Sequence, residues 1–543
     1  MRRLLPILSG TLLLLAAWSG TADAPGYDLV VRGGRVVDGT GNPAFFGDVA
    51  VKDGHIAEVG AVPGRGREEV DVDGQVVAPG FIDVHTHAEN VESLPLAESF
   101  VRMGVTSVVT GNCGGSKLDV AAFFRSLEQK PASINVATLV GHNTVREEAM
   151  GGSFDRPPTA DELAHMQGLV WGAMADGAVG LSTGLIYLPG TFSKTEEIIA
   201  LAKVASVHDG IYASHIRNEG NGIRTALDEL FQVAREARIR AQVSHLKLGG
   251  KAAWGRAEEV LGAIERARAD GLDVTQDQYV YTASSTGISQ MIPSEAREGS
   301  REQFLARIAD PAQKAKIAAQ MRESLRARGQ ESYDYAVIAS YRADPSLNGK
   351  NLVEAARLKR GSDSLADQIE LILEIQANGG ASGVFHGMSE ADLTTFLRHP
   401  NTMVAADSGV RRFGEGVPHP RGYGNNARVL ARYVREQKVL RLEDAVRKMT
   451  SLPAGTFRLR DRGLLRPGAR ADLVVFDPAR VQDRATYQAP HAYPDGIPYV
   501  WVNGVAVVRR GEHTGARPGM PLRHAEKKLP ETLSRRLSPR SNE

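Results

Sequence analysis

Hydrophobic and polar positions alternate with a period of two near both ends of the chain. DLVVRGGRVVDGTG, DVAVKDGHIAEVG and EEVDVDGQVV lie between Tyr27 and Val77, and GARADLVVFDPAR and YVWVNGVAVVRRGEH lie near the C-terminus. Turns rich in glycine, such as GG and DG, separate these runs, which predicts short strands joined by hairpins. Because the two ends share this style, we expect residues 25–78 and 461–510 to form one small β-sandwich domain.

Between these ends, apolar strand-like runs alternate with amphipathic helical stretches such as EEIIALAKVASVHDG and RTALDELFQVAREARIR. This alternation predicts an α/β fold with a parallel sheet, and eight repeats would close a (β/α)8 TIM barrel over residues 79–460. We find nine candidate strands, one more than such a barrel holds, and expect GVFHGMS to be the extra one. The candidates are FIDVHTH, TSVVTGNCG, INVATLVGHN, AVGLSTGL, IYASHI, AQVSHLK, DVTQDQY, GVFHGMS and TMVAADSG.

Two further segments differ from the barrel pattern. Residues from about 288 to 350 are polar, charged and helical, and we expect them to form an insertion near the barrel mouth. Residues 511–543 are rich in Arg, Lys and Pro, which predicts a basic C-terminal tail that wraps the surface or stays loose.

The first 24 residues have the layout of a signal peptide. Arg2 and Arg3 precede an apolar run from Leu4 to Ala17, and Ala22-Asp23-Ala24 offers small residues for cleavage. The run is too short to span a bilayer comfortably, although an uncleaved membrane anchor is the alternative interpretation. We therefore expect an exported, periplasmic protein without a stable membrane anchor after cleavage.

Composition narrows the class of protein and of partner. The chain has 543 residues, of which 42% are hydrophobic and 24% charged, as is typical of a globular protein with a large core. Lys+Arg number 65 and Asp+Glu 64, so the net charge of +1 gives no electrostatic basis for a nucleic-acid partner. The single cysteine excludes an intramolecular disulfide. A small molecule is the expected substrate, and nothing in the sequence indicates a particular oligomeric state.

Residues with metal-binding chemistry follow several of the predicted strands. His85 and His87 in PGFIDVHTH point to one side of their strand and could share a metal ion. Cys113 in GNCGGS is flanked by glycines, which favours a loop and a zinc-binding thiolate over the packed role that a free cysteine usually has. His215 in YASHIRNEG and His245 in VSHLKLGG end later strands, where each alone would equally suit a hydrogen-bonded core histidine.

An aspartate completes this set of strand-end residues. Asp407 ends the last strand in VAADSG, where it would ordinarily be a turn former but could here hold a metal and take a proton. His142 and His386 are weaker candidates for contact with metal or substrate, and His419 is expected to be structural.

The order of these motifs resembles a known family. PGFIDVHTH, GNCGG, GLSTGLIYLPG, SHIRNEG, SHLK, DQYVYTASSTG, ADSG and HPRGYG are similar to the D-aminoacylase (N-acyl-D-amino-acid deacylase) branch of the amidohydrolase superfamily. The resemblance covers residues from about 27 to 510. It implies a zinc-dependent hydrolase that converts N-acyl-D-amino acids to a carboxylate and a free D-amino acid.

The resemblance also implies a role for each matching residue. Cys113, His215 and His245 would hold the tight zinc, and His85, His87 and Asp407 a second, weaker one. Asp407 would be the catalytic proton shuttle. The substrate's α-carboxylate would be bound by Lys247, Tyr281, Ser285 and Arg421. The chain departs from the family at ADSG, at GNNAR and at Tyr279-Val280-Tyr281, which affects substrate preference more than the metal site.

Two other functions are compatible with parts of this pattern. One is a ring-opening cyclic amidohydrolase of the dihydropyrimidinase or hydantoinase kind. Against it, the fourth strand AVGLSTGL contains no lysine that could bridge two metals, and Cys113 stands in its place. The other is a non-catalytic exported binding protein, which would need a broken metal set, whereas this set is intact.

Overall fold

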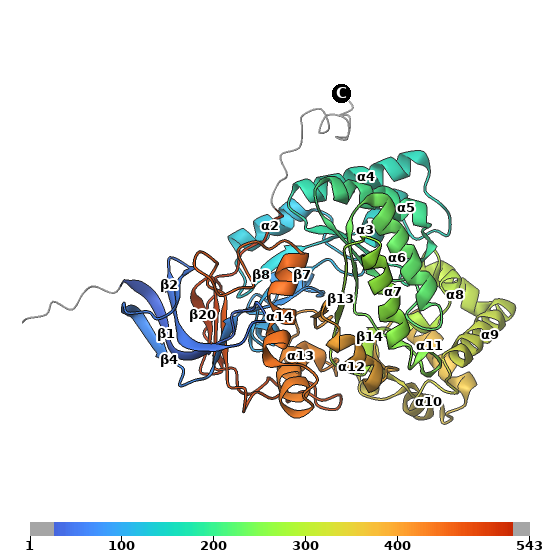
Figure 1. Cartoon of the computed structure of the whole chain (residues 1–543). Coiled ribbons are helices and arrows are strands. Elements are labelled where there is room, and N and C mark those ends of the chain that lie inside the picture. The colour runs from blue at the N-terminus through green and yellow to red at the C-terminus, as the bar shows by residue number, and fades with distance from the viewer. Residues whose placement is uncertain (1–25, 525–543) are drawn as a thin grey trace, which may run out of the picture.

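The computed structural model describes residues 26–524 and contains three parts: a β domain, a barrel and an insertion (Figure 1). The predicted signal peptide lies outside the described residues, as does the last part of the predicted tail. Among the helices of residues 26–524, none has the length and apolar character needed to cross a bilayer.

Both ends of the chain meet in the β domain, as predicted. Nine strands form one mixed sheet, in which β5 pairs antiparallel with β18 and so joins the N-terminal to the C-terminal strands. Leu29 and Val31 from one end pack with Leu473 and Trp501 from the other, and this shared core fixes the two halves together. The strands are β1 (Tyr27–Val36), β2 (Phe45–Lys52), β3 (His55–Gly60), β4 (Gly66–Asp71), β5 (Val76–Pro79), β18 (Leu473–Phe476), β19 (Tyr499–Val502), β20 (Val505–Arg509) and β21 (Glu512–His513).

Parallel strands close into the predicted TIM barrel. A three-stranded sheet ends at β8 and a six-stranded sheet begins at β9, but these two are one strand interrupted at Leu139, so the barrel has eight strands. Hydrogen bonds from Asp407 N to His85 O and from His87 N to Ser408 O, both 2.9 Å, close the ring between its last and first strands. The strands are β6 (Phe81–Asp83), β7 (Val105–Thr110), β8 (Asn135–Thr138), β9 (Val140–Gly141), β10 (Gly180–Gly184), β11 (Ile211–His215), β12 (Arg240–Val243), β13 (Val274–Gln278) and β17 (Thr402–Val404).

Amphipathic helices cover the outside of the barrel. In α6, the apolar residues Ile223, Leu227, Leu230 and Phe231 recur every three or four positions and are buried against the neighbouring elements. The helices that follow successive strands are α1 (Glu98–Val101), α2 (Val120–Gln129), α3 (His142–Met150), α4 (Ala160–Ala175), α5 (Thr195–Val207), α6 (Ile223–Ala237), α7 (Ala257–Ala269), α12 (Glu390–Arg398), α13 (Arg421–Arg428), α14 (Leu442–Met449) and α15 (Ser451–Thr456). The helices cover the sides of the barrel and leave the carboxyl ends of its strands open, and we call this open end the mouth of the barrel.

The insertion between β13 and β17 is larger than the predicted 288–350. It has its own core, which includes Phe304, Met321, Leu352 and Ile372, and its own antiparallel sheet in the order β14-β16-β15. GVFHGMS contributes β16 to this sheet, which confirms that it is the extra strand. The helical pattern beyond residue 350 resembles that of the barrel, so the sequence did not mark the insertion's end. Its elements are β14 (Ala283–Gly287), α8 (Arg301–Ala309), α9 (Pro311–Ala327), β15 (Ala336–Ser340), α10 (Leu352–Arg360), α11 (Leu365–Ala377) and β16 (Ser382–His386).

The described part of the predicted tail packs on the protein. β21 extends the β domain, and the chain then crosses to the barrel beside β8. Val136 N donates to Met520 O at 3.0 Å, and Leu522 N donates to Val136 O at 2.8 Å. Residues 512–524 thus wrap the surface.

Candidate metal centre

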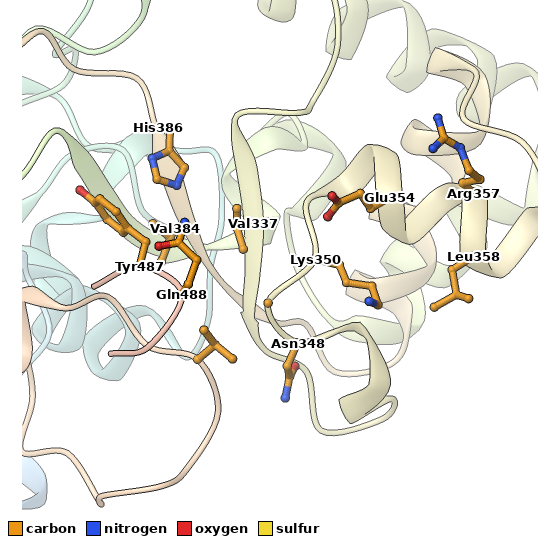
Figure 2. Close-up of a pocket in the computed structure, with 12 residues that line it drawn as sticks. Val337, Asn348, Lys350, Glu354, Arg357, Leu358, Val384, His386, Tyr487 and Gln488 are labelled. Carbon is orange, nitrogen blue, oxygen red and sulfur yellow. The ribbon is translucent and has the colours of Figure 1, made fainter. Parts of the chain in front are cut away.

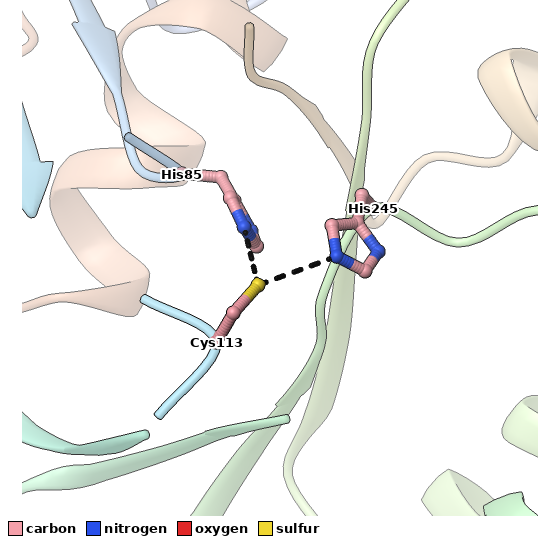
Figure 3. A group of neighbouring side chains, drawn as sticks. All are labelled: His85, Cys113 and His245. Atoms are coloured by element: carbon pink, nitrogen blue, oxygen red, sulfur yellow. Dashed lines mark hydrogen bonds between the residues drawn. The ribbon is translucent and has the colours of Figure 1, made fainter. Parts of the chain in front are cut away.

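A single thiol lies among three imidazoles at the carboxyl ends of the barrel strands. Cys113 Sγ is 3.3 Å from His85 Nε2, 3.4 Å from His245 Nε2 and 3.7 Å from His215 Nδ1. Figure 3 shows His85 and His245 approaching the sulfur from two sides. All four residues are buried. This cluster brings together four of the residues that the sequence analysis assigned to metal.

The remaining two predicted ligands lie beside this cluster. Asp407 Oδ1 is 3.2 Å from His87 Nε2 and 3.7 Å from His85 Nε2. His85 is therefore shared between the thiol on one side and the carboxylate on the other. The six predicted ligands form one continuous group, with His87 its most exposed member at 40% of the side chain.

Backbone strain accompanies three of these residues. Cys113, His245 and Asp407 have φ values of 53°, 36° and 50°, in the left-handed region that residues with a Cβ seldom adopt. Each follows a barrel strand, where the turn aims the side chain into the mouth. Strain of this kind costs about 1–3 kcal/mol per residue and persists where the surrounding structure imposes it, as at functional sites.

Two carboxylates that the sequence analysis did not identify, the buried Asp277 and the half-buried Glu219, hold the histidines in place. Asp277 Oδ1 accepts a hydrogen bond from His245 N at 3.0 Å, and its Oδ2 lies 3.4 Å from His85 Nδ1. Glu219 Oε1 lies 3.0 Å from His245 Nδ1. Such outer partners orient metal-binding imidazoles and fix their tautomers. Glu219 follows β11 and Asp277 lies near the end of β13, both far along the chain from His85 and His245, so no sequence motif marks them.

The protonation states suit a cation. Burial lowers the pKa of His215 to about 4, and burial together with Lys247 lowers the pKa of His245 well below its usual value, so both imidazoles are neutral at pH 7. Burial would raise the pKa of Asp407, but Arg421 and His87 outweigh it and hold that carboxyl ionised. Burial raises the pKa of the Cys113 thiol, so a thiolate here needs a nearby cation to stabilise it.

These donors fit a zinc ion. Thiolate and neutral imidazole are the ligands that zinc prefers in proteins. His215 turns its Nδ1 toward Cys113, while its buried Nε2 has no hydrogen-bond partner among the described residues and lies 3.7 Å from Glu219 Oε2. Three overlapping groups have ligand atoms close enough to share an ion: His85, Cys113 and His245; His85, His87 and Asp407; and His215, Glu219 and His245.

Two cations predicted to bind substrate converge on one ring. Lys247 Nζ lies 5.7 Å from the centre of the Tyr279 ring, and Arg421 Cζ lies 4.4 Å from it. Lys247 also pairs with Glu219 at 2.5 Å, and Arg421 with Asp407 at 2.9 Å. Lys247 therefore lies on the side of the metal cluster held by Glu219, and Arg421 lies on the side of Asp407.

Tyr281 and Ser285, predicted to join these cations, are placed differently. Tyr281 packs under Arg428, whose Cζ is 4.7 Å from the ring centre, so Tyr279 is the tyrosine beside both cations. Both serines lie in β14, where Ser284 pairs with Phe385 and Ser285 with Val384, and it is Ser284 that lines the cavity also lined by Lys247. Ser285 contributes its main-chain oxygen, 3.4 Å from Arg421 Nη2. Successive side chains of a strand face opposite sides of the sheet, so an assignment that is wrong by one residue places the side chain on the wrong face.

The other candidate histidines lie outside the metal cluster. His142 Nε2 is 2.8 Å from Glu197 Oε1 in a buried network with Arg146. His419 donates from Nε2 to Ala283 O at 2.9 Å and accepts at Nδ1 from Arg421 N at 3.0 Å, a structural role as predicted. His386 packs edge-to-face against Tyr487, with ring centres 4.6 Å apart.

His386 belongs to a cavity of about 870 Å³, which we call the outer cavity (Figure 2). Figure 2 shows His386, Tyr487 and Gln488 facing Lys350 and Glu354 across it. None of the six predicted metal ligands lines this cavity. A smaller cavity of about 340 Å³, the mouth cavity, includes Glu219 and Lys247 and so adjoins the metal cluster. None of the six ligands lines the mouth cavity itself, but Glu219 and Lys247 both contact His245, so this cavity offers a substrate an approach to the cluster.

Comparison with known proteins places this site in a family. Residues 68–508 match the Amidohydrolase family. The chain is 36% identical to the N-acyl-D-glutamate deacylase of Alcaligenes xylosoxydans xylosoxydans, over 91% of this chain and 96% of that protein. It is 35% identical to the D-aminoacylase of the same organism, over 92% and 98%. The crystal structure of an N-acyl-D-glutamate deacylase from Bordetella bronchiseptica, complexed with zinc and a phosphonate inhibitor, superposes with a TM-score of 0.79 at 35% identity, covering 92% of this chain and 99% of that one.

Proposed function

The chain belongs to the amidohydrolase family, and we propose that it hydrolyses the amide bond of N-acyl-D-amino acids with zinc as its cofactor. The observation that carries this proposal is the Cys113 thiol within 3.3–3.7 Å of three imidazole nitrogens at the barrel mouth. Relatives that match over more than nine-tenths of their length are deacylases of such substrates. The products would be a carboxylate and a free D-amino acid.

Cys113, His215 and His245 would hold the tight zinc, and His85, His87 and Asp407 a second, weaker one. When bound, zinc supplies a Lewis acid that activates water at neutral pH and polarises the acyl carbonyl. His85 lies within 3.7 Å of both the thiol and the Asp407 carboxylate and so connects the two sets.

Asp407 is the proposed proton shuttle. Its carboxylate is kept ionised by Arg421 and His87, and it lies at the end of the last strand, beside the cluster. From there it would accept the proton of the attacking water and deliver it to the nitrogen of the leaving amine.

Lys247 and Arg421 would bind the α-carboxylate of the amino acid. Both lie against Tyr279, so their charges converge near one point of the mouth. Arginine can bind a carboxylate with two parallel hydrogen bonds, while lysine contributes a compact charge. Tyr279 lies beside both cations, where Tyr281 was expected; Ser284 lines the mouth cavity with Lys247, and Ser285 contacts Arg421 through its main-chain oxygen. This fixed carboxylate would present the acyl group of the D-enantiomer to the metal cluster.

The ring-opening alternative receives less support. Strand β10, GLSTG, carries no lysine that could bridge two metals, and the relatives with high coverage act on linear N-acyl substrates. The non-catalytic alternative is disfavoured by the intact set of ligands around Cys113.

A substrate comparison tests the proposed function. Zinc-loaded protein is given N-acetyl-D-amino acids, their L-enantiomers and a hydantoin, and the released amino acid or ring-opened product is quantified. We expect turnover of the D-substrates, at least about 100-fold slower turnover of the L-substrates, and none of the hydantoin. Turnover of the hydantoin alone, or of no substrate, would refute the proposal.

We also propose that the protein is exported to the periplasm. The basic, apolar and small-residue segments of residues 1–24 support this. Cell fractionation with N-terminal sequencing of the mature protein tests it: we expect a periplasmic chain that begins near residue 25, and a cytoplasmic, full-length chain would refute it.

A further inference from the structure

A second cavity extends the mouth cavity away from the metal cluster. This side cavity has a volume of about 270 Å³ and shares Ile186, Arg217, Ser324, Arg328 and Tyr335 with the mouth cavity. A substrate with its amide bond at the cluster therefore has continuous space for a further group. This space lies between the barrel loops and the insertion.

The charged groups on the walls of these two cavities are mostly cationic. Arg217 and Arg328 line both, Arg297 lines the side cavity, and Lys247 lines the mouth. Glu219 is the one acid among the lining residues, and it is already paired with Lys247 at 2.5 Å. The outer cavity differs, because its Lys350 and Arg357 alternate with Glu354.

Not all of these arginines are available to a ligand. Arg217 forms an ion pair with Glu229 at 2.9 Å and also donates to the main-chain oxygens of Thr191 and Ser193. In contrast, no carboxylate oxygen of residues 26–524 lies within 4.0 Å of the charged nitrogens of Arg297 or Arg328. Two guanidinium groups on the cavity wall thus lack an anionic partner within the described structure: Arg297 is half-buried, and Arg328 is exposed at the rim.

Arg297 is the more informative of the two. It is half-buried, and its Nε donates to Ile292 O at 3.1 Å, which fixes the guanidinium while leaving its terminal nitrogens free of carboxylates. Burial lowers its pKa to about 10, so it remains charged at pH 7. A partly desolvated cation is costly unless an anion compensates it. The apolar side chains of Met291, Ile292 and Leu325 on the same walls suit methylene groups.

We infer that the side cavity is a subsite for a second carboxylate of the substrate, carried either by the side chain of the D-amino acid or by its acyl group, and bound by Arg297 and Arg328. This inference rests on the proposed function and specifies its substrate class. The two relatives do not decide it, since one is an N-acyl-D-glutamate deacylase and the other a D-aminoacylase, and they are about equally similar to the chain.

Four substrates test the inference on the wild-type enzyme. N-acetyl-D-glutamate and N-acetyl-D-glutamine differ in a side-chain carboxylate, and N-succinyl-D-leucine and N-acetyl-D-leucine differ in an acyl carboxylate. We expect kcat/KM to favour the dianion of at least one pair by about 10- to 100-fold, as suits a hydrogen-bonded charge pair. The preferred pair identifies which group enters the side cavity.

Variants then assign the effect to the arginines. Arg297→Met and Arg328→Met should each lower kcat/KM for the preferred dianion by about tenfold or more and leave its neutral partner within about twofold. Arg326→Met is the matched control, because Arg326 is an exposed arginine on α9 that lines neither cavity. Arg297→Lys should restore part of the preference, which a purely structural role would not explain.

The outcomes separate this inference from the proposed function. If all four substrates are hydrolysed with equal kcat/KM, the second-carboxylate subsite is refuted and the proposed function stands. Equal losses for dianionic and neutral substrates in both methionine variants would also refute it. If no N-acyl-D-amino acid is hydrolysed, the proposed function fails and the inference fails with it.

Discussion

At the residue scale, burial raises the pKa of the Cys113 thiol and so disfavours a free thiolate. The same thiol is nevertheless in contact with three imidazole rings. A bound cation reconciles these two facts, because it stabilises the thiolate that burial opposes. Its left-handed backbone, φ 53°, is a further cost that a purely packed cysteine would not require.

Replacement of Cys113 by alanine should therefore release the tight zinc. The thiolate is the softest ligand of the set, and its loss should weaken zinc binding by more than about 100-fold. Metal content after dialysis measures this, with circular dichroism as the control for folding. Full zinc retention by Cys113→Ala would show that the residue is only packed.

Asp407→Asn separates proton transfer from metal binding. The amide keeps the shape and an oxygen but cannot accept a proton, so kcat should fall by about 10²–10⁴-fold. Zinc content should persist, because Cys113, His215 and His245 are unchanged. The assay is repeated with added zinc to compensate for any loss from the weaker site. Near-normal turnover with zinc bound would contradict the role of Asp407.

At the scale of elements, a buried charge network joins α3 to α5 behind the mouth. Glu197 of α5 contacts both His142 and Arg146 of α3. Glu197→Gln leaves Arg146 buried without a counter-charge, and we expect a loss of about 3–5 kcal/mol in the free energy of unfolding at pH 7. Urea denaturation measures it, and a loss below about 1 kcal/mol would show that the network contributes little.

The same network predicts a pH dependence. Burial would raise the pKa of Glu197, but its contacts with His142 and Arg146 outweigh burial and hold the pKa below its usual value. The network's contribution is therefore present above the unfolded-state pKa of about 4.3 and is lost as pH falls through the lower folded-state pKa. The stability difference between wild type and Glu197→Gln should narrow below about pH 4. A constant difference down to pH 3 would contradict this.

Particular elements show what sequence alone could predict. The eight barrel strands and the extra strand were readable, because buried parallel strands are short apolar runs between helices. The size of the insertion was not, because β14 (ASSTG) has no apolar alternation and α10 and α11 resemble barrel helices.

Within the site, the strand-end histidines, cysteine and aspartate could be predicted because their order along the chain follows the barrel. The sequence could not show, however, to which side of its strand or loop a neighbouring side chain points. Ser284 and Ser285 face opposite ways, and only the pairing of β14 with β16 decides between them. Glu219 and Asp277 were missed because acids that support histidines through space have no fixed spacing from them.

At the scale of the whole molecule, the two chain ends depend on each other. β5 is covered by β18, and Val474, Val500 and Val508 of the C-terminal strands are fully buried. A chain that stops after Leu464 would lose the C-terminal strands and expose β5 together with the N-terminal half of the shared core, which includes Leu29 and Val31. We expect this truncated chain to aggregate on expression, because the uncovered edge of the β-domain sheet at β5 is a template for association. A soluble truncated chain with native-like circular dichroism would contradict this view of the β domain.

The account's central claim is that zinc bound at the Cys113 cluster is required to hydrolyse N-acyl-D-amino acids. Its most direct test is a zinc titration of metal-free enzyme, in which bound zinc and hydrolysis of an N-acetyl-D-amino acid are measured on the same samples. We predict negligible hydrolysis without metal and activity that rises in proportion to bound zinc until the tight site is filled at about one ion per chain. Full hydrolysis by the metal-free enzyme, or zinc binding without any gain in activity, would contradict the claim.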